Sequence, residues 1–326
     1  GYYARFLESF PTVEALAAAP EELLLKRWEG LGYYSRARNL QKAAKIVTER
    51  YGGRFPADYG ALLALPGIGE YTAGAVASAA FGLRIPAVDG NALRVAARIA
   101  DCRGDIALPG TKRLVRDWMG AAMPEVPEEI RRFNQAVMDL GATVCVPNGA
   151  PKCEGCPASP FCLARQRGTA LSLPVKAPKR ARRREEKTVF LLRRGGTVAL
   201  RRRGETGLLA GLWEFPNAEG TLRETEAASV LAGWGLEPKA WDRQISARHI
   251  FTHVEWEMTG YSLEVAGSGP EDFLWADGPA LERCAVPSAF AKYCAEAKAL
   301  LNRSEPRGKS GGPVPDAGSG DVGGAL

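Results

Sequence analysis

Four cysteines crowd into eighteen residues near the middle of the chain, and no other feature limits the fold as much. They follow the pattern Cys-x7-Cys-x2-Cys-x5-Cys at Cys145, Cys153, Cys156 and Cys162. Four thiolates from one compact loop suit a [4Fe–4S] cluster or a structural zinc ion. Zinc sites usually pair two short Cys-x2-4-Cys units, and only one close pair occurs here. The spacing therefore favours one [4Fe–4S] cluster per chain, held by the loop 145–162.

Length and composition set the broad class. Seven cysteines in 326 residues do not fit a secreted disulfide scaffold, which would be small, and favour a reducing compartment. The apolar content of 46% and the charged content of 25% are ordinary for a soluble protein, and the length predicts two domains. No apolar run of about 18 residues and no signal peptide is visible, so we expect no membrane partner.

The residues before the cysteine loop are predicted to form one helix after another. The segments with suitable first turns and closing residues are 20–30, 35–52, 70–81, 91–100, 111–123 and 127–141. No segment with β periodicity intervenes. We therefore predict an all-α domain over residues 1–164, including the cysteine loop.

The character of the chain changes after the cysteine loop. Residues 165–186 are predicted to be a basic linker, since Lys176 to Lys187 carries seven basic and two acidic residues. Strand and helix patterns then alternate over residues 187–302, with Gly195-Gly196 as a hairpin signal. Residues 303–326 are rich in Gly, Ser and Pro and are expected to be disordered. The second domain is thus predicted to be α+β.

The stretch LPGIGEYTAG, residues 65–74, is typical of a tight glycine turn that leads directly into a helix. Gly67 and Gly69 allow backbone conformations that are closed to other residues. The N–H groups from Ile68 to Tyr71 would then converge and attract an anion, helped by the helix dipole. The alternative is a helix–turn–helix corner packed on itself, and this stretch alone leaves both interpretations open.

Asp89 lies in AVDGNALRV, one or two residues before a predicted helix. Its ordinary role would be a helix N-cap. One helix and a short loop separate it from Tyr71, so the starts of two helices could face each other. A carboxylate there could stabilise a sugar cation that develops in a transition state.

In combination, these segments resemble a known family. GLGYYSRARNL (30–40), LPGIGEYTAG (65–74), VDGN (88–91), RFNQAVMDLGATVC (132–145) and the cysteine loop stand in the same order as in the MutY family of adenine DNA glycosylases. The wider helix–hairpin–helix glycosylase superfamily, which includes endonuclease III, shares the hairpin, the aspartate and the cysteines. GLGYYSRARNL is the segment that points to the MutY family.

The resemblance implies catalytic roles for three residues. Asp89 would stabilise or briefly capture the oxocarbenium-like C1′, and Asn91 would position the site. Tyr71 stands where bifunctional relatives carry a lysine that attacks the sugar as a Schiff-base nucleophile. A phenol cannot form that imine, so we expect a monofunctional glycosylase that leaves an abasic site. Tyr71 could also hydrogen-bond to Asp89.

The resemblance also implies how DNA is held. The backbone amides of Gly67, Ile68 and Gly69 would grip a phosphate beside an extruded nucleotide. Tyr33 would wedge into the duplex next to 8-oxoguanine, and Arg38 of the same segment would lie among the DNA contacts. A buried aromatic at a helix start is the alternative role for Tyr33.

The sequence departs from the family pattern in two places. Seven residues separate the first two cysteines where the family has six, and we expect the loop to absorb the extra residue. The family's general acid, a glutamate in a Glu-Val-Met-Leu-Gln-Gln-type motif that protonates adenine, occurs nowhere in the chain. Since the chain begins at Gly1 in an amphipathic helix already under way, we expect an N-terminally truncated sequence that lacks this helix.

Residues 187–302 resemble the MutT-like domain of the same family, with TGLLAGLWEFPN as the recognisable loop. Phe251, Thr252 and His253 match its Phe-Ser-His loop that inspects 8-oxoguanine. Glu255 stands where the family often has a second histidine. An ordinary β-strand is the alternative for this segment. The paired glutamates of a Nudix hydrolase box are absent from LRETEAASVLAGWGLEP, so a recognition module is expected.

The expected function is removal of adenine mispaired with 8-oxoguanine or guanine in double-stranded DNA, by a monomer in the bacterial cytoplasm, at the nucleoid. A lesion-recognising protein without catalysis, a Nudix-type nucleotide hydrolase and a bifunctional lyase are the competing hypotheses. The broken Nudix box disfavours the second, and Tyr71 and the second domain disfavour the third.

Overall fold

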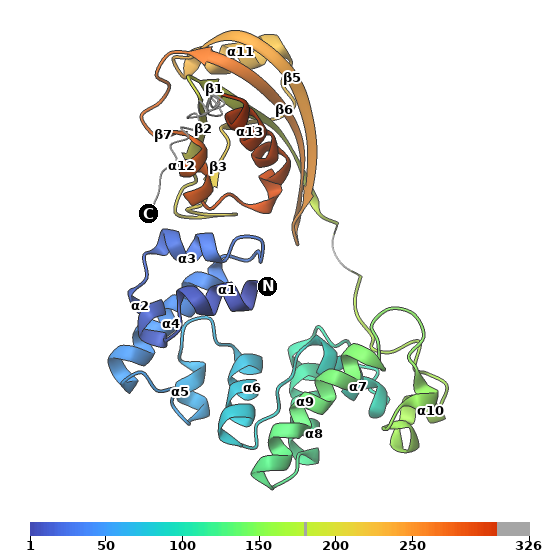
Figure 1. Ribbon diagram of the computed structural model, residues 1–326. Helices are drawn as coiled ribbons and strands as arrows, with labels where there is room; N and C mark the ends of the chain where they lie inside the picture. Colours follow the sequence, from blue (N-terminus) through green and yellow to red (C-terminus); the bar gives the residue numbers. More distant parts are fainter. Residues whose placement is uncertain (179–180, 305–326) are drawn as a thin grey trace, which may run out of the picture. The chain divides into compact units, whose positions relative to one another are not determined.

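The computed structural model describes residues 1–178 and 181–304, and the chain divides into two compact units (Figure 1). The helical unit spans Gly1–Arg182 and the sheet unit begins at Arg183. The division confirms two domains, the first helical and the second mixed. The predicted tail, residues 303–326, lies outside the described residues apart from its first two positions, which belong to the last helix.

The helical unit contains α-helices joined by short loops, with no strand among its described residues. The helices are α1 (Tyr2–Ser9), α2 (Val13–Ala18), α3 (Glu21–Arg27), α4 (Ser35–Tyr51), α5 (Tyr59–Leu63), α6 (Glu70–Phe81), α7 (Gly90–Ile99), α8 (Pro109–Ala122), α9 (Pro127–Thr143) and α10 (Leu163–Gln166). Two short 3-10 turns, Cys153–Gly155 and Ser159–Phe161, lie within the cysteine loop. None of the described helices is both long and apolar enough to cross a membrane.

Local sequence explains where these helices begin and end. The side chains of Asp58 and Asp89 accept a backbone N–H from the first turns of α5 and α7. Proline in the first turn starts α8 and α9. Gly52 and Gly82 adopt left-handed conformations, with φ of 59° and 67°, and end α4 and α6.

Helix α7 packs against α8, α9 and α10. Ala92, Ala96 and Ala97 pack against α8 in one apolar cluster, and α9 runs beside α7 with Gly141 close to Asn91. Two arginines of the same helix, Arg94 and Arg98, are only 7% and 5% exposed. A helix with buried arginines needs acceptors around it, and these are described with the site.

The sheet unit holds a seven-stranded mixed sheet. Its strands are β1 (Arg183–Arg194), β2 (Thr197–Arg202), β3 (Trp213–Glu214), β4 (Asn217–Glu219), β5 (Glu237–Ile250), β6 (Val254–Ala266) and β7 (Phe273–Ala276). The order is β3-β2-β1-β6-β5, with β4 paired to β1 and β7 to β2. β1 and β6 run parallel, and the other pairs are antiparallel.

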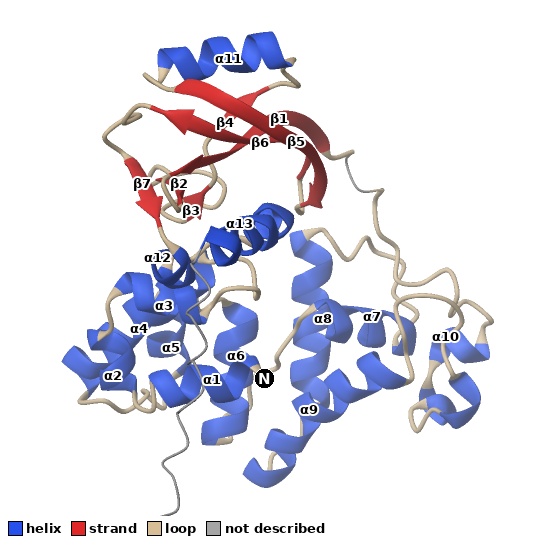
Figure 2. Cartoon of the chain, turned by 45° about the horizontal axis from the view of Figure 1, so that its top comes forward, coloured by secondary structure: helices blue, strands red, loops and turns tan. Residues whose placement is uncertain are grey.

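Helices cover both faces of this sheet. Figure 2 shows α11 (Glu224–Gly233) on one face and α12 (Gly278–Arg283) and α13 (Ala291–Ser304) on the other. Side chains of a strand alternate between faces, so Val189 and Leu191 join the α12 and α13 side while Phe190 and Leu192 join the α11 side. Two apolar cores therefore hold β1 from both faces.

Two predictions about this unit need correction, and one strand was not predicted. The basic linker ends at Arg182, because Arg183 to Lys187 pair with β6 as the start of β1. Residues 237–247 form most of β5, a largely exposed edge strand whose polar sequence gave no alternating signal. Residues 251–253 form a turn between β5 and β6, so the interpretation as an ordinary strand was wrong.

Candidate active site and cysteine cavity

Of the two glycines in the turn before α6, only Gly67 has the left-handed backbone that was predicted for a tight turn. Gly67 has a φ of +77°, and a Cβ there would lie 2.6 Å from the Cβ of Asn39 in α4. This close approach brings the turn against the segment that carries Tyr33 and Arg38.

The other half of the turn differs from the prediction. Gly69 has a φ of −90°, which any residue can adopt, and it serves as the N-cap of α6 without a side-chain partner. The N–H of Ile68 donates to the carbonyl oxygen of Leu65 at 3.1 Å and is not free to bind an anion. A Cβ at Gly69 would meet no atom within 4 Å. An anion could therefore approach Gly69 and the first turn of α6 but not the Ile68 amide.

The two tyrosines before α4 have opposite environments. Tyr33 is 68% exposed and has a φ of 48°, a left-handed conformation that is uncommon for an aromatic residue. Tyr34 is 6% exposed and is the buried aromatic at the helix start. The alternative role for Tyr33 is therefore wrong. Arg38 pairs with Glu21 of α3, with 2.8 Å between Nε and Oε1.

Asp89 is the N-cap of α7, as its ordinary role predicted. Its Oδ1 accepts the N–H of Ala92 at 2.8 Å, and the residue is partly buried. Within the described part of the chain its Oδ2 accepts no hydrogen bond. Tyr71 is 42% exposed at the start of α6, and its hydroxyl makes no hydrogen bond to Asp89 or to any other described residue. The expected Tyr71–Asp89 bond is thus absent from this structure.

Asn91 is held by a buried arginine of its own helix. Its Oδ1 accepts a hydrogen bond from Nη2 of Arg94 at 2.8 Å. The same guanidinium donates to the carbonyl oxygens of Gly141 at 2.7 Å and Cys145 at 2.8 Å. Burial is the main cause that lowers the pKa of Arg94. One buried arginine therefore connects the start of α7, the end of α9 and the first cysteine.

The four predicted cysteines line a single cavity. They share it with aliphatic side chains such as Val95 of α7 and Leu140 of α9, and none of the four is in a disulfide. Burial, followed by the charges of Cys162, Cys156 and Cys145, raises the pKa of Cys153. Four thiolates this close repel one another unless a cationic group neutralises them, so the donor set fits a metal centre.

The arrangement also bears on which metal centre fits. A single zinc needs its ligands about 2.0–2.3 Å from one point. In residues 1–178 and 181–304, no three His, Cys, Asp or Glu side chains converge in a way that could hold one ion. Four thiols around a common cavity are a donor set that fits either a [4Fe–4S] cluster or a zinc ion.

Arg98 places a positive charge beside this cavity. Its Nη1 lies 3.3 Å from Sγ of Cys145 and 3.1 Å from the carbonyl oxygen of Val146. Its Nε donates to the carbonyl oxygen of Leu173 at 2.9 Å, and its own carbonyl accepts from the Cys162 thiol at 3.5 Å. Arg98 therefore connects α7 to both ends of the cysteine loop.

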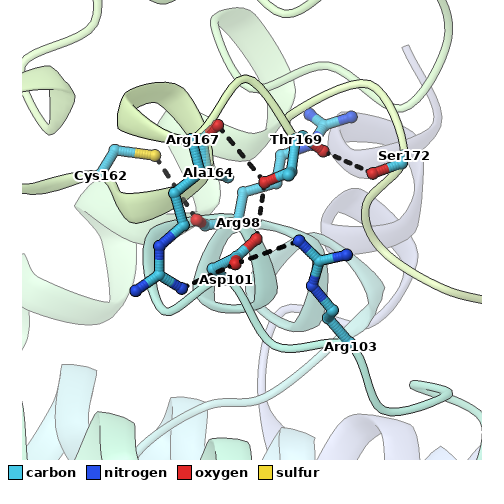
Figure 3. A network of polar contacts seen from close by, with 8 residues as sticks. All are labelled: Arg98, Asp101, Arg103, Cys162, Ala164, Arg167, Thr169 and Ser172. Carbon is cyan, nitrogen blue, oxygen red and sulfur yellow. Dashed lines mark hydrogen bonds and ion pairs between the residues drawn. The ribbon is translucent and has the colours of Figure 1, made fainter.

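A second polar network holds the segment that follows Cys162 (Figure 3). Asp101 accepts from Oγ1 of Thr169 at 2.6 Å and from Nη1 of Arg167 at 2.9 Å. The Thr169 hydroxyl first, and then Arg167, lower the pKa of the Asp101 carboxyl. Arg103 adds a weaker contact at 3.5 Å. The C-terminal end of α7 is thus tied to the chain that leaves the cysteine loop.

In the sheet unit, Thr252 and His253 are exposed at the turn between β5 and β6. Phe251 anchors this turn: its ring lies 4.6 Å from His249 and 4.8 Å from Trp256, both in edge-on geometry. Glu255, at the position of the family's second histidine, is 6% exposed and pairs with Arg248 across the hairpin. It is therefore buried in an ion pair rather than presented at the turn.

The structure brings together some predicted residues and adds others. The Gly67 turn lies against the Tyr33 segment, and the four cysteines line one cavity, whereas Phe251 to His253 belong to a separate unit. Arg94 and Arg98 escaped prediction because arginine usually lies on the surface. The available signal was their spacing of four residues in the otherwise apolar run ALRVAARI.

Comparisons with known proteins agree with this architecture. A model described as "HhH-GPD superfamily base excision DNA repair protein" matches residues 1–120, and one described as "NUDIX domain" matches residues 188–296. The adenine DNA glycosylase of Homo sapiens is 33% identical over 352 residues, which cover 89% of this chain and 63% of that protein. That of Buchnera aphidicola subsp. Baizongia pistaciae is 34% identical over 261 residues and covers 80% and 71%.

Among solved structures, a non-covalent endonuclease III–DNA complex matches with 28% identity and a TM-score of 0.44, over 51% of this chain and 75% of that one. The chain spans about two thirds of the length of the mammalian relatives, 63% of the human protein and 66% of the mouse protein. On the strength of the sequence matches, the chain belongs to the adenine DNA glycosylase family of the helix–hairpin–helix base-excision repair superfamily.

Proposed function

We propose that this protein is a monofunctional adenine DNA glycosylase that removes adenine mispaired with 8-oxoguanine or guanine. The observation that carries the proposal is the state of the Asp89 carboxylate. One oxygen caps α7, and the other has no partner among the described residues. A partly buried carboxylate with one free oxygen can stabilise the positive charge that develops at C1′ when the glycosidic bond breaks.

The neighbouring residues define the type of reaction. Tyr71 offers a phenol at the start of α6 and no amine, so no Schiff base forms and the product is an abasic site. Asn91, held by Arg94, would orient the sugar or the attacking water beside Asp89. We assign no general acid within these 326 residues, because no glutamate motif of the family's kind occurs in them.

DNA would be held by the glycine turn and by Tyr33. The uncapped start of α6 at Gly69, with open space above it, suits a phosphate. Tyr33 is exposed and has a strained, left-handed backbone, as expected of a residue whose side chain enters the duplex. Arg38 would contribute positive charge beside it, and the net charge of +6 favours association with DNA.

The cysteine cavity would hold a [4Fe–4S] cluster through Cys145, Cys153, Cys156 and Cys162. When bound, the cluster supplies a rigid cross-link at the end of α7, with Arg98 as a charged donor to one of the ligand sulfurs. In the sheet unit, Thr252 and His253 would contact 8-oxoguanine from the turn that Phe251 anchors. We further propose that the protein acts as a monomer in the cytoplasm.

Single-turnover release of adenine from a duplex with adenine opposite 8-oxoguanine tests the proposal, with binding measured on the same duplex. Release that disappears in Asp89→Asn supports the assigned role of Asp89 and requires an acid that we have not identified. Binding without release favours a lesion-recognising protein without catalysis. Release accompanied by strand cleavage would contradict the monofunctional assignment.

A further inference from the structure

The segment that delivers Asp89 has no regular secondary structure of its own. Residues 82–89 join α6 to α7 and contain neither helix nor strand. The position of Asp89 relative to α6 therefore depends on what holds this segment. We propose that Asn134, in the middle of α9, is the positioning residue that sets it. The inference rests on the proposed role of Asp89.

The side-chain amide of Asn134 bonds to three partners, one in α6 and two in the segment 82–89. Its Nδ2 donates to Oγ of Ser78 in α6 at 2.8 Å and to the carbonyl oxygen of Ile85 at 3.0 Å. Its Oδ1 accepts the N–H of Ala87 at 3.0 Å, two residues before Asp89. A backbone carbonyl only accepts and a backbone N–H only donates, so the chemistry of the partners fixes the orientation of the amide.

These contacts are buried. Asn134 is 6% exposed, Ser78 1% and Ala87 1%. Water cannot replace a lost partner easily at such a site, so each bond is expensive to leave unmade. Only an amide side chain of this length supplies both the donor and the acceptor that the segment needs.

The segment is also fixed by a close contact with α6. A Cβ at Gly74 would lie 2.6 Å from the carbonyl oxygen of Pro86. Helix α6, which carries Tyr71, therefore touches the segment directly at Gly74 and indirectly through Ser78 and Asn134. Tyr71 and Asp89 are held at a set distance by one polar bridge and one steric contact.

The test compares two abasic-site analogues, each placed opposite 8-oxoguanine in the same duplex. One is a neutral tetrahydrofuran, and the other is a pyrrolidine whose protonated ring nitrogen mimics the sugar cation. The measured quantity is the ratio of their dissociation constants for the full chain. We expect the wild type to prefer the cationic analogue and Asp89→Asn to lose that preference, because a well-placed carboxylate favours the cation.

Asn134→Leu removes all three hydrogen bonds with little change in volume. We expect the preference for the cationic analogue to fall about tenfold, since displacements of about 1 Å can have effects of that size or greater. The affinity for the neutral analogue should stay constant, which a general loosening of the fold would not produce. Gln135→Leu, which replaces an exposed amide on the same helix whose one hydrogen-bond partner among the described residues is Asp139, should leave the ratio unchanged.

A second variant tests the same geometry if Asn134→Leu does not fold. Gly74→Ala pushes the segment away from α6, and we expect the same selective loss for the cationic analogue. Gly120→Ala is its matched control, because a Cβ there meets the Cγ of Pro86 at an ordinary 3.9 Å.

The possible failures are distinguishable. If the wild type binds both analogues equally, the proposed role of Asp89 is wrong, and the role of Asn134 falls with it. If the wild type discriminates and the Asn134 and Gly74 variants discriminate equally well, Asn134 does not position Asp89. An equal loss of affinity for both analogues would likewise overturn the positioning role.

Discussion

The candidate residues of the helical unit and those of the sheet unit are supported in different ways. The segment before Asp89 and the side chain of Asn91 are held by buried polar side chains: Asn134 of α9 accepts the N–H of Ala87, and Arg94 donates to Asn91 within α7. Thr252 and His253 stand exposed above one apolar anchor. The first arrangement fixes the direction of a charge and is sensitive to distant changes. The second presents a surface whose shape depends on the aromatic ring directly beneath it.

The difference suits the two tasks. Stabilising a transition state requires groups held within a fraction of an ångström, which buried polar networks can do. Recognising a lesion through surface contacts tolerates more motion, because binding can select the right conformation. We therefore expect substitutions behind Asp89 to change its chemistry and substitutions at the turn to change recognition alone.

Removal of one thiol from the cysteine cavity should have the largest effect on stability, and that effect should be confined to the helical unit. Cys156→Ser is expected to lose the bound cluster and to lower the stability of the helical unit by about 4 kcal/mol, as for a ligand held at a thousandfold excess over its Kd. The iron, sulfide and zinc content would measure the loss of the cluster, and calorimetry would measure the loss of stability. Cys102→Ser, outside the cavity, should change neither the metal content nor the stability. One zinc per chain and no sulfide would establish the zinc alternative.

Loss of the aromatic anchor should come next and should be confined to the sheet unit. Phe251→Ala is expected to cost about 2 kcal/mol, below the range for a fully buried phenylalanine, because this ring is only partly buried. The preference for 8-oxoguanine over guanine should fall with it. Phe251→Leu restores much of the volume and should recover part of both. A shift in the melting of the helical unit would contradict the separation of the units.

The Asp101 network predicts a pH-dependent effect of smaller size. Its pKa is lowered in the folded protein, below the ordinary value of about 3.9. The ionised carboxylate therefore stabilises the fold above that value, and the contribution is lost as the pH falls through the folded pKa. Asp101→Asn should lower the melting temperature at pH 7 by a few degrees, and this difference should shrink as the pH falls below about 3.9 toward the folded pKa.

The substitution isolates the charge because asparagine also tolerates the left-handed backbone at this position, where φ is +47°. Thr169→Val, which removes the first partner of Asp101, should lower the melting temperature in the same direction. A difference between wild type and Asp101→Asn that is as large at pH 2 as at pH 7 would show that ionisation of Asp101 contributes nothing.

Much of this architecture could be predicted because neighbouring residues in the sequence determine it. Helices α4, α6, α8 and α9 follow from apolar periodicity with prolines and glycines at their ends. The role of Asp89 as an N-cap follows from its place before α7. Tertiary support leaves no such local trace, since nothing near Asn134 in the sequence indicates that its amide bonds to Ser78 and Ala87.

The errors have physical causes. Position 69 was expected to need glycine for its backbone angles, but its φ is one that any residue can adopt. The absence of a side chain there instead leaves open space beside the start of α6. The basic run before β1 was interpreted as solvated linker because charges usually face water. In the structure Lys187 lies over the ring of Trp256, and Glu185 accepts the hydrogen bond from its indole N–H. The run is therefore half linker and half strand.

The smallest predicted effect is the sharpest test of how the turn works. Thr252→Val keeps the shape of an exposed side chain and removes its hydroxyl, so the stability should stay within about 0.5 kcal/mol of wild type. One hydrogen bond to the lesion is worth about 1 kcal/mol, so the preference for a duplex with 8-oxoguanine over one with guanine, each opposite the tetrahydrofuran analogue, should fall about fivefold. Affinity for the guanine duplex should not change, because the lost bond is specific to the lesion. Thr252→Ser, which retains the hydroxyl, should keep the preference. If valine and serine behave alike, the hydroxyl does not contact the lesion, and recognition would fall to His253 or to the backbone of the turn.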